Sequence, residues 1–114
     1  MEQVELYVYK ALVTDVYDGD TVTLSIDLGL GIWKHKVKVR LAGIDAPEIR
    51  GEERPFGLES EHYLSGMILG KEVVVQTFKD KTGKYGRLIA DIYLDGLDVS
   101  TDLVEKGYAV FKEY

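Results

Sequence analysis

Acidic and basic side chains gather in three short stretches that could together handle a phosphate group. They occupy residues 18–21, 40–48 and 84–87. The planar guanidinium of an arginine matches the oxygens of a phosphate. Carboxylates, for their part, suit a hard cation such as Ca²⁺. The pattern therefore favours phosphate chemistry assisted by a cation, although a salt-bridged surface turn explains the middle stretch equally well when it is taken alone.

The middle stretch combines one arginine with two carboxylates at the end of a strand. It begins with alternating apolar and polar residues and presents Arg40 on the polar side. Gly43 and Pro47 then interrupt the strand ladder. We expect the strand to hold Arg40 firmly and its exit to deliver Asp45 and Glu48.

The first stretch places Asp18 and Asp20 on either side of Gly19. An Asp-Gly pair usually marks only a tight turn, as the pair at residues 95–96 suggests. Asp20, however, shares its strand parity with the apolar residues at positions 22, 24 and 26. Asp20 is therefore expected near the mouth of a barrel and not in open solvent.

Length and composition indicate one ordinary folded domain, residues 1–114, which we expect to be a monomer. Without cysteine there is neither a disulfide nor a thiolate metal site. The net charge of -6 argues mildly against a nucleic acid partner, unless the basic residues are grouped locally. No signal-peptide pattern or membrane-spanning run occurs, so we expect a cytoplasmic protein unless the chain is a piece of a secreted one.

Hydrophobic periodicity predicts five strands and two helices. The strands are expected at residues 4–17, 21–28, 32–42, 73–78 and 87–94. A charged loop at 49–56 should precede a helix that begins at Gly57 and ends at Gly70, and Ser100 should cap a short helix that ends at Gly107, before an extended tail. This order predicts an α+β fold, an OB-like five-stranded Greek-key barrel with a helix between strands three and four and a short C-terminal helix. A small open α+β sheet is the alternative.

Alternation along the third strand predicts two chemically different faces. The core side should hold the odd positions Trp33, Val37, Val39 and Leu41. The outer side should carry a continuous basic stripe formed by Lys34, Lys36, Lys38 and Arg40. His35 should lie on the face opposite the stripe and His62 on the helix, and for both a packing or surface role is expected.

Taken together and in this order, the three stretches resemble the staphylococcal nuclease (thermonuclease) family. The resemblance rests on Asp-Gly-Asp-Thr, on Arg-Leu-x-Gly-Ile-Asp-x-Pro-Glu and on Lys-Tyr-Gly-Arg, with a helix between the last two. It runs from about residue 12 to the end of the chain.

The resemblance implies a set of site residues. Asp20, Asp45 and the main-chain carbonyl of Ala46 match calcium ligands, and Asp18 matches an outer-shell carboxylate. Glu48 matches the glutamate that positions, or deprotonates, the attacking water. Arg40 and Arg87 match the arginines that grip the scissile phosphate, and Lys84 and Tyr85 match residues that hold a neighbouring phosphate. To these the basic stripe adds Lys36 and Lys38 as residues expected to bind the substrate.

The resemblance implies a calcium-dependent nuclease that hydrolyses phosphodiester bonds of DNA and RNA, preferentially single-stranded, with low sequence specificity and with 3′-phosphate ends as product. No membrane partner is expected. The alternative is a non-catalytic OB-fold module that binds single-stranded nucleic acid or a protein. Because this chain retains the carboxylates and arginines that such modules lose, we favour the enzyme.

Overall fold

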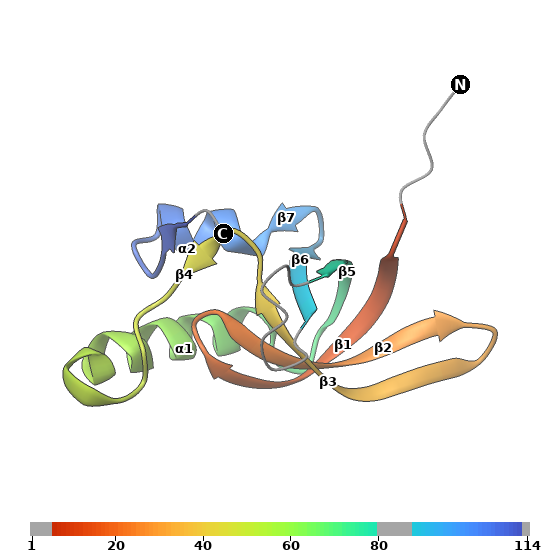
Figure 1. Cartoon of the computed structure of the whole chain (residues 1–114), viewed down its shortest axis with the longest axis horizontal. Coiled ribbons are helices and arrows are strands. Elements are labelled where there is room, and N and C mark those ends of the chain that lie inside the picture. The colour runs from red at the N-terminus through yellow and green to blue at the C-terminus, as the bar shows by residue number, and fades with distance from the viewer. Residues whose placement is uncertain (1–5, 80–87, 113–114) are drawn as a thin grey trace, which may run out of the picture.

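Five long strands form a closed barrel in the computed structural model, which describes residues 6–79 and 88–112 (Figure 1). The strands are β1 (Val8–Asp18), β2 (Thr21–Gly29), β3 (Ile32–Leu41), β5 (Glu72–Lys79) and β6 (Leu88–Leu94). They pair antiparallel in the order β3-β2-β1-β5-β6, and a parallel pairing of β6 with β3 closes the ring. The predicted five-stranded OB-like α+β barrel is thereby confirmed, and the open sheet is excluded.

Three strands of two residues each extend this frame: β4 (Ile44–Asp45), β7 (Leu97–Asp98) and β8 (Val110–Phe111). Strand β7 pairs with β6, whereas β4 and β8 form a separate antiparallel pair. The tail predicted after residue 107 is therefore partly a strand, and it lies against the exit of β3. The periodicity of the sequence did not predict this pairing.

The first helix begins earlier than predicted. A 3-10 turn, η1 (Gly51–Glu53), leads directly into α1 (Arg54–Ile68), so the second half of the predicted loop at 49–56 is helical. Pro55 is compatible with this start, because the N–H that proline lacks has no partner in the first turn of a helix. At the other end Gly70 adopts a φ of 75°, in agreement with its predicted role as the C-terminal stop.

The cap of the second helix, α2 (Val99–Glu105), is Asp98 and not Ser100. The Asp98 carboxylate accepts hydrogen bonds from the backbone N–H groups of Ser100 and Thr101. Ser100 itself is buried inside the first turn. Because both residue types are good caps, sequence alone did not distinguish them. Within the described part of the chain, neither helix is long and apolar enough to cross a bilayer.

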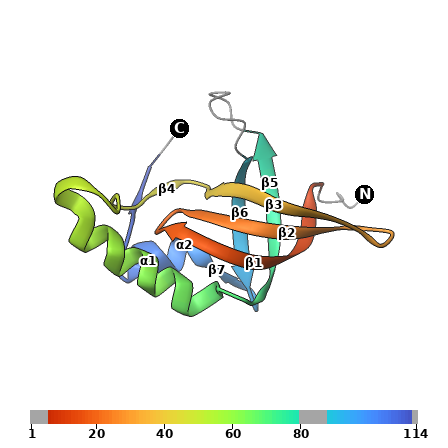
Figure 2. The same ribbon diagram turned by 90° about the horizontal axis from the view of Figure 1, so that it is seen from below.

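The core fills the barrel and continues beneath α1, which covers the end of β1 (Figure 2). Helix α1 buries Leu64 and Ile68 completely. Its Tyr63 stacks on Tyr108 with ring centroids 4.4 Å apart and donates a hydrogen bond to the Asp102 carboxylate of α2. That hydrogen bond raises the pKa of Tyr63 to about 12. These contacts fix α1 to the C-terminal segment that carries β8.

A bulge in β3 overturns the predicted alternation of this strand. Leu24 of β2 pairs with Val37, but Ile26, two residues further on, pairs with Lys34. One extra residue therefore lies in β3, and Lys36 takes up the change with a φ of 57°. Directly paired residues share a face, so the two faces of β3 exchange at the bulge.

Three predictions fail as a result. The basic stripe is not continuous, because Lys34 shares the face of the buried Ile26 whereas Lys38 lies on the opposite face. Trp33 does not face the core and is 47% exposed. His35, predicted opposite the stripe, instead lies on the same face as Lys38.

Candidate active site

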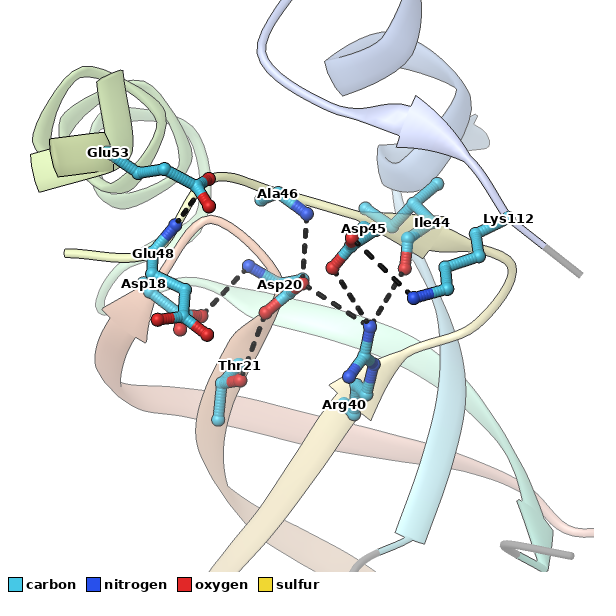
Figure 3. A network of polar contacts seen from close by, with 10 residues as sticks. All are labelled: Asp18, Asp20, Thr21, Arg40, Ile44, Asp45, Ala46, Glu48, Glu53 and Lys112. Carbon is cyan, nitrogen blue, oxygen red and sulfur yellow. Dashed lines mark hydrogen bonds and ion pairs between the residues drawn. The ribbon is translucent and has the colours of Figure 1, made fainter. Parts of the chain in front are cut away.

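Asp20 is the buried carboxylate at the centre of the candidate site (Figure 3). It follows the Asp18-Gly19 turn, and only 6% of the residue is exposed. Its Oδ2 accepts a hydrogen bond from the Ala46 N–H at 3.0 Å, and its Oδ1 accepts one from the Thr21 hydroxyl at 3.2 Å. Two donors, one at the start of β2 and one directly after β4 (Ile44–Asp45), therefore orient the Asp20 carboxylate.

The Arg40 guanidinium lies between two carboxylates. Its Nη2 is 3.6 Å from Asp20 Oδ2 and 3.3 Å from Asp45 Oδ1. The same nitrogen donates to the carbonyl oxygen of Ile44 at 3.3 Å. Only 20% of the Arg40 side chain is exposed, so these contacts are shielded from bulk water. The end of β3, the short strand β4 and the turn between β1 and β2 thus bring together the arginine and both carboxylates.

Strand β8 supports Asp45 from the other side. Asp45 pairs with Val110, and the backbone N–H of Lys112 donates to the Gly43 carbonyl at 2.9 Å. The Lys112 ammonium is 3.8 Å from Asp45 Oδ2. Because both side chains are about half exposed, this ion pair contributes little to the stability of the fold.

Asp18 and Glu48 line the opposite side of the site (Figure 3). Asp18 Oδ1 accepts from the backbone N–H of Asp20 at 3.1 Å. The Glu48 N–H donates to Glu53 Oε2 at 3.4 Å, while the Glu48 side chain is 67% exposed. Helix α1 packs so closely here that a Cβ atom on Gly57 would collide with the Glu48 carbonyl oxygen. The position of Glu48 therefore depends on the helix start.

These side chains surround an open pocket of about 210 Å³. Four carboxylates line it, from Asp18, Asp20, Asp45 and Glu48, with two guanidinium groups from Arg40 and Arg50. The lining is therefore negative overall, which favours a cation and disfavours an uncompensated phosphate.

Burial and the neighbouring Asp18 raise the pKa of Asp20 to about 6. The Ala46 N–H and Arg40 oppose this shift but do not cancel it. A negative charge at this position is thus costly in the protein without a bound ion.

The chemistry of the pocket fits a calcium ion, although carboxylates alone cannot complete its coordination. All the acceptors are oxygens, which is the ligand type that Ca²⁺ prefers. Among the described residues, however, no three acidic side chains are grouped tightly enough to hold a metal. Carbonyl oxygens and water would have to supply the remaining ligands, which calcium sites accept readily.

The structure thus assembles most of the predicted site residues. Six of them line the same pocket: Asp18, Asp20, Arg40, Asp45, Ala46 and Glu48. Lys36 and Lys38 are exposed along β3, away from this lining. The predicted residues Lys84, Tyr85 and Arg87 lie outside the described residues.

Besides further lining residues such as Arg50, sequence reasoning missed three residues that contact the predicted site residues. Thr21 orients Asp20, Lys112 contacts Asp45, and Glu53 accepts from the backbone of Glu48. Thr21 could have been found, since it directly follows Asp20 in the motif. The other two could not, because they depend on the β4–β8 pairing and on the early helix start.

Comparison with known proteins identifies relatives of this chain. Residues 38–114 match the family model described as staphylococcal nuclease homologue. A probable staphylococcal-like nuclease of Oryza sativa subsp. japonica is 39% identical over 74 residues, which are 65% of this chain and 21% of that protein. An uncharacterized endonuclease of Haemophilus influenzae is 34% identical over 104 residues, 90% of this chain and 52% of that protein. A probable endonuclease of Neosartorya fischeri is 33% identical over 89 residues, 68% of this chain and 30% of that protein. The chain thus spans between about a fifth and about half of the length of these relatives.

Proposed function

Because the chain belongs to the family of staphylococcal nuclease homologues, we propose that it is a calcium-dependent nuclease that hydrolyses phosphodiester bonds of DNA and RNA with low sequence specificity. The observation that carries the proposal is the convergence of Asp20 and Asp45 on Arg40 in an open, negatively lined pocket. A cation bound there would offset the negative charge of the pocket and allow a phosphate to bind, and Arg40 already lines the pocket.

In this proposal Asp20, Asp45 and the main-chain carbonyl of Ala46 would hold the ion, with Asp18 in its outer shell. A bound calcium ion would supply a Lewis acid for a phosphoryl oxygen. Asp20 and Asp45, once engaged with the ion, would hold Arg40 less tightly and leave its guanidinium free to contact the phosphate. The donor pair of a guanidinium then stabilises the charge that grows on the phosphate oxygens in the transition state.

Glu48 accepts the proton of the attacking water or orients that water, and its exposed carboxylate suits either role. The water oxygen forms the new bond to phosphorus as the bond to the 5′ oxygen breaks. The products are a 3′-phosphate and a 5′-hydroxyl. By its place in the Lys-Tyr-Gly-Arg motif, we assign Arg87, which lies outside the described residues, as the second guanidinium. Lys84 and Tyr85 are assigned to the neighbouring phosphate.

The test measures nicking of supercoiled plasmid and cleavage of single-stranded RNA, each with calcium and with chelator. We expect cleavage only with calcium, and products that polynucleotide kinase labels without prior phosphatase treatment. Asp45→Ala should abolish cleavage, whereas Glu72→Gln, an exposed carboxylate on β5, should not affect it. Binding of single strands without any calcium-dependent cleavage would contradict the enzyme and support the non-catalytic module.

A further inference from the structure

The β2–β3 hairpin is an arm that extends past the rest of the barrel. The last β1–β2 pair is Lys10 with Asp27, and beyond it residues 28–33 continue as a hairpin tip (Figures 1 and 2). The apolar side chains at the tip contribute little to the barrel core, because Leu28, Ile32 and Trp33 are each about half exposed. The tip therefore presents apolar surface to something outside the barrel.

Two residues of this hairpin adopt backbone conformations that usually belong to glycine. Leu30, at the turn, has a φ of 58° and is 99% exposed. Lys36, at the bulge, has a φ of 57°. A positive φ is unfavourable for residues with such side chains. Leu30 adopts it where the hairpin turns, and Lys36 adopts it where β3 bulges.

The bulge determines which side chains accompany Arg40. Strand β2 keeps its alternation from Thr21 to Asp27, so that Thr21, Thr23 and Asp27 share one face. Opposite them in β3 lie Arg40, Lys38 and Trp33, respectively. Without the bulge, Trp33 would face the other way. The bulge at Lys36 therefore places the Trp33 side chain on the same face of the hairpin as Lys38 and Arg40.

His35 completes this face. Its Nδ1 is hydrogen-bonded to Ser25 at 2.8 Å, which fixes the imidazole above β2. The Trp33 and His35 rings are nearly parallel, with an interplanar angle of 8° and centroids 6.4 Å apart. Asp27, the acidic residue beside them, directs its carboxylate to the Gly29 N–H at 2.8 Å. An exposed aromatic pair is thus held in place at the outer end of the face.

We propose that this face, formed by Arg40, Lys38, His35 and Trp33, is a binding track for single-stranded nucleic acid. The proposal rests on the proposed function, which it extends by a subsite distant from the cleaved bond. Cations that contact phosphates combined with aromatic rings that stack on bases are the usual means of holding a single strand. From Arg40 to Trp33 the strand spans roughly 20 Å, enough for about three extended nucleotides. The twist of the hairpin rotates the face gradually, which a flexible single strand can follow and a stiff duplex cannot.

Trp33 is the only tryptophan of the chain, so its fluorescence reports this subsite directly. The probes are single-stranded oligothymidylates of roughly 12 and roughly 3 nucleotides, with a chelator present so that the strands stay intact. We expect the longer strand to quench Trp33 emission. In an anisotropy titration with labelled strand, Trp33→Ala and His35→Ala should each weaken binding of the longer strand roughly tenfold, and Trp33→Phe should restore most of it.

Lys34 and Lys38 provide a matched pair of controls, since they lie on opposite faces of the same strand. Lys38→Ala should weaken binding of the longer strand, whereas Lys34→Ala should change it little. Equal losses from the two lysines, or unchanged affinity in Trp33→Ala, would overturn the track. So would a Trp33 emission shift with phosphatidylglycerol vesicles but not with the strand, since the arm would then contact lipid.

Plasmid nicking separates this inference from the proposed function. If the protein cleaves with calcium but binds long strands equally well without Trp33, the proposed function stands and the binding track is refuted. If it binds strands through Trp33 but does not cleave them, the binding track stands and the nuclease function is refuted.

Discussion

Asp20 is a residue whose burial opposes its charge, and this makes a prediction about stability and pH. Its pKa in the folded protein, about 6, lies above the ordinary value of 3.8. The folded state thus binds more protons than the unfolded state between these values, so this group's contribution to stability is lost as the pH rises through 6. In Asp20→Asn this loss should vanish, and the metal-free variant should be more stable than the parent at pH 7 by about 1 to 3 kcal/mol.

Chemical denaturation with chelator at pH 4 and pH 7 measures this difference. Asp18→Asn is the comparison, because it removes the neighbouring charge and should recover part of the same stabilisation. If the free energy of unfolding falls equally in Asp20→Asn and in the parent between pH 4 and pH 7, burial does not destabilise the charged form of the Asp20 carboxylate.

Arg40 and Lys38 share a face of β3 but should act at different stages of the reaction. Arg40→Lys should lower kcat by roughly 100-fold, because a point charge cannot replace a planar fork at the reacting phosphate. Lys38→Ala should raise KM and spare kcat, since a contact made equally in the ground and transition states affects binding alone. Steady-state kinetics on a single-stranded substrate distinguish these outcomes, and similar losses of kcat in both variants would refute the division.

At the scale of elements, the contact of α1 with the Glu48 loop is testable through glycine. In Gly57→Ala the new methyl group must displace the Glu48 backbone. We expect lower stability and a kcat reduced by roughly tenfold or more, because small misplacements of a catalytic group are costly. Gly66→Ala is the matched control, since nothing lies within 4 Å of its added Cβ and alanine should stabilise the helix by about 1 kcal/mol. A Gly57→Ala enzyme with normal kcat would show that the helix does not position Glu48.

The elements also show how far sequence reasoning reaches. The barrel strands were predictable because period-two apolar patterns and Asp-Gly turns are local signals. Asp20, Arg40 and Asp45 could be proposed because they stand at strand ends that a barrel brings together. The β3 bulge was not predictable, since Lys36 carries a conformation that normally belongs to glycine. The β4–β8 pair was also missed, because two-residue strands leave no period to detect.

At the scale of the molecule, the negative pocket should couple ion binding to stability. We expect saturating calcium with a 3′,5′-bisphosphate nucleotide to raise the Tm by roughly 5 °C or more, because both bind only the folded state. Chelator should reverse the shift, and Asp45→Ala should abolish it. Thermal unfolding of the two proteins, each with and without these additions, measures the effect, and an unchanged Tm in the parent would argue against an ion site.

The pairing of β8 with β4 has a practical consequence for anyone who works with this protein. Lys112 stands beside Asp45, whereas the start of β1 lies on the far side of the barrel (Figure 1). Any peptide fused behind Lys112 therefore starts at the edge of the pocket. A polyhistidine tag or a fluorescent fusion placed there could obstruct substrate or compete for ions, so affinity handles and labels belong at the other end.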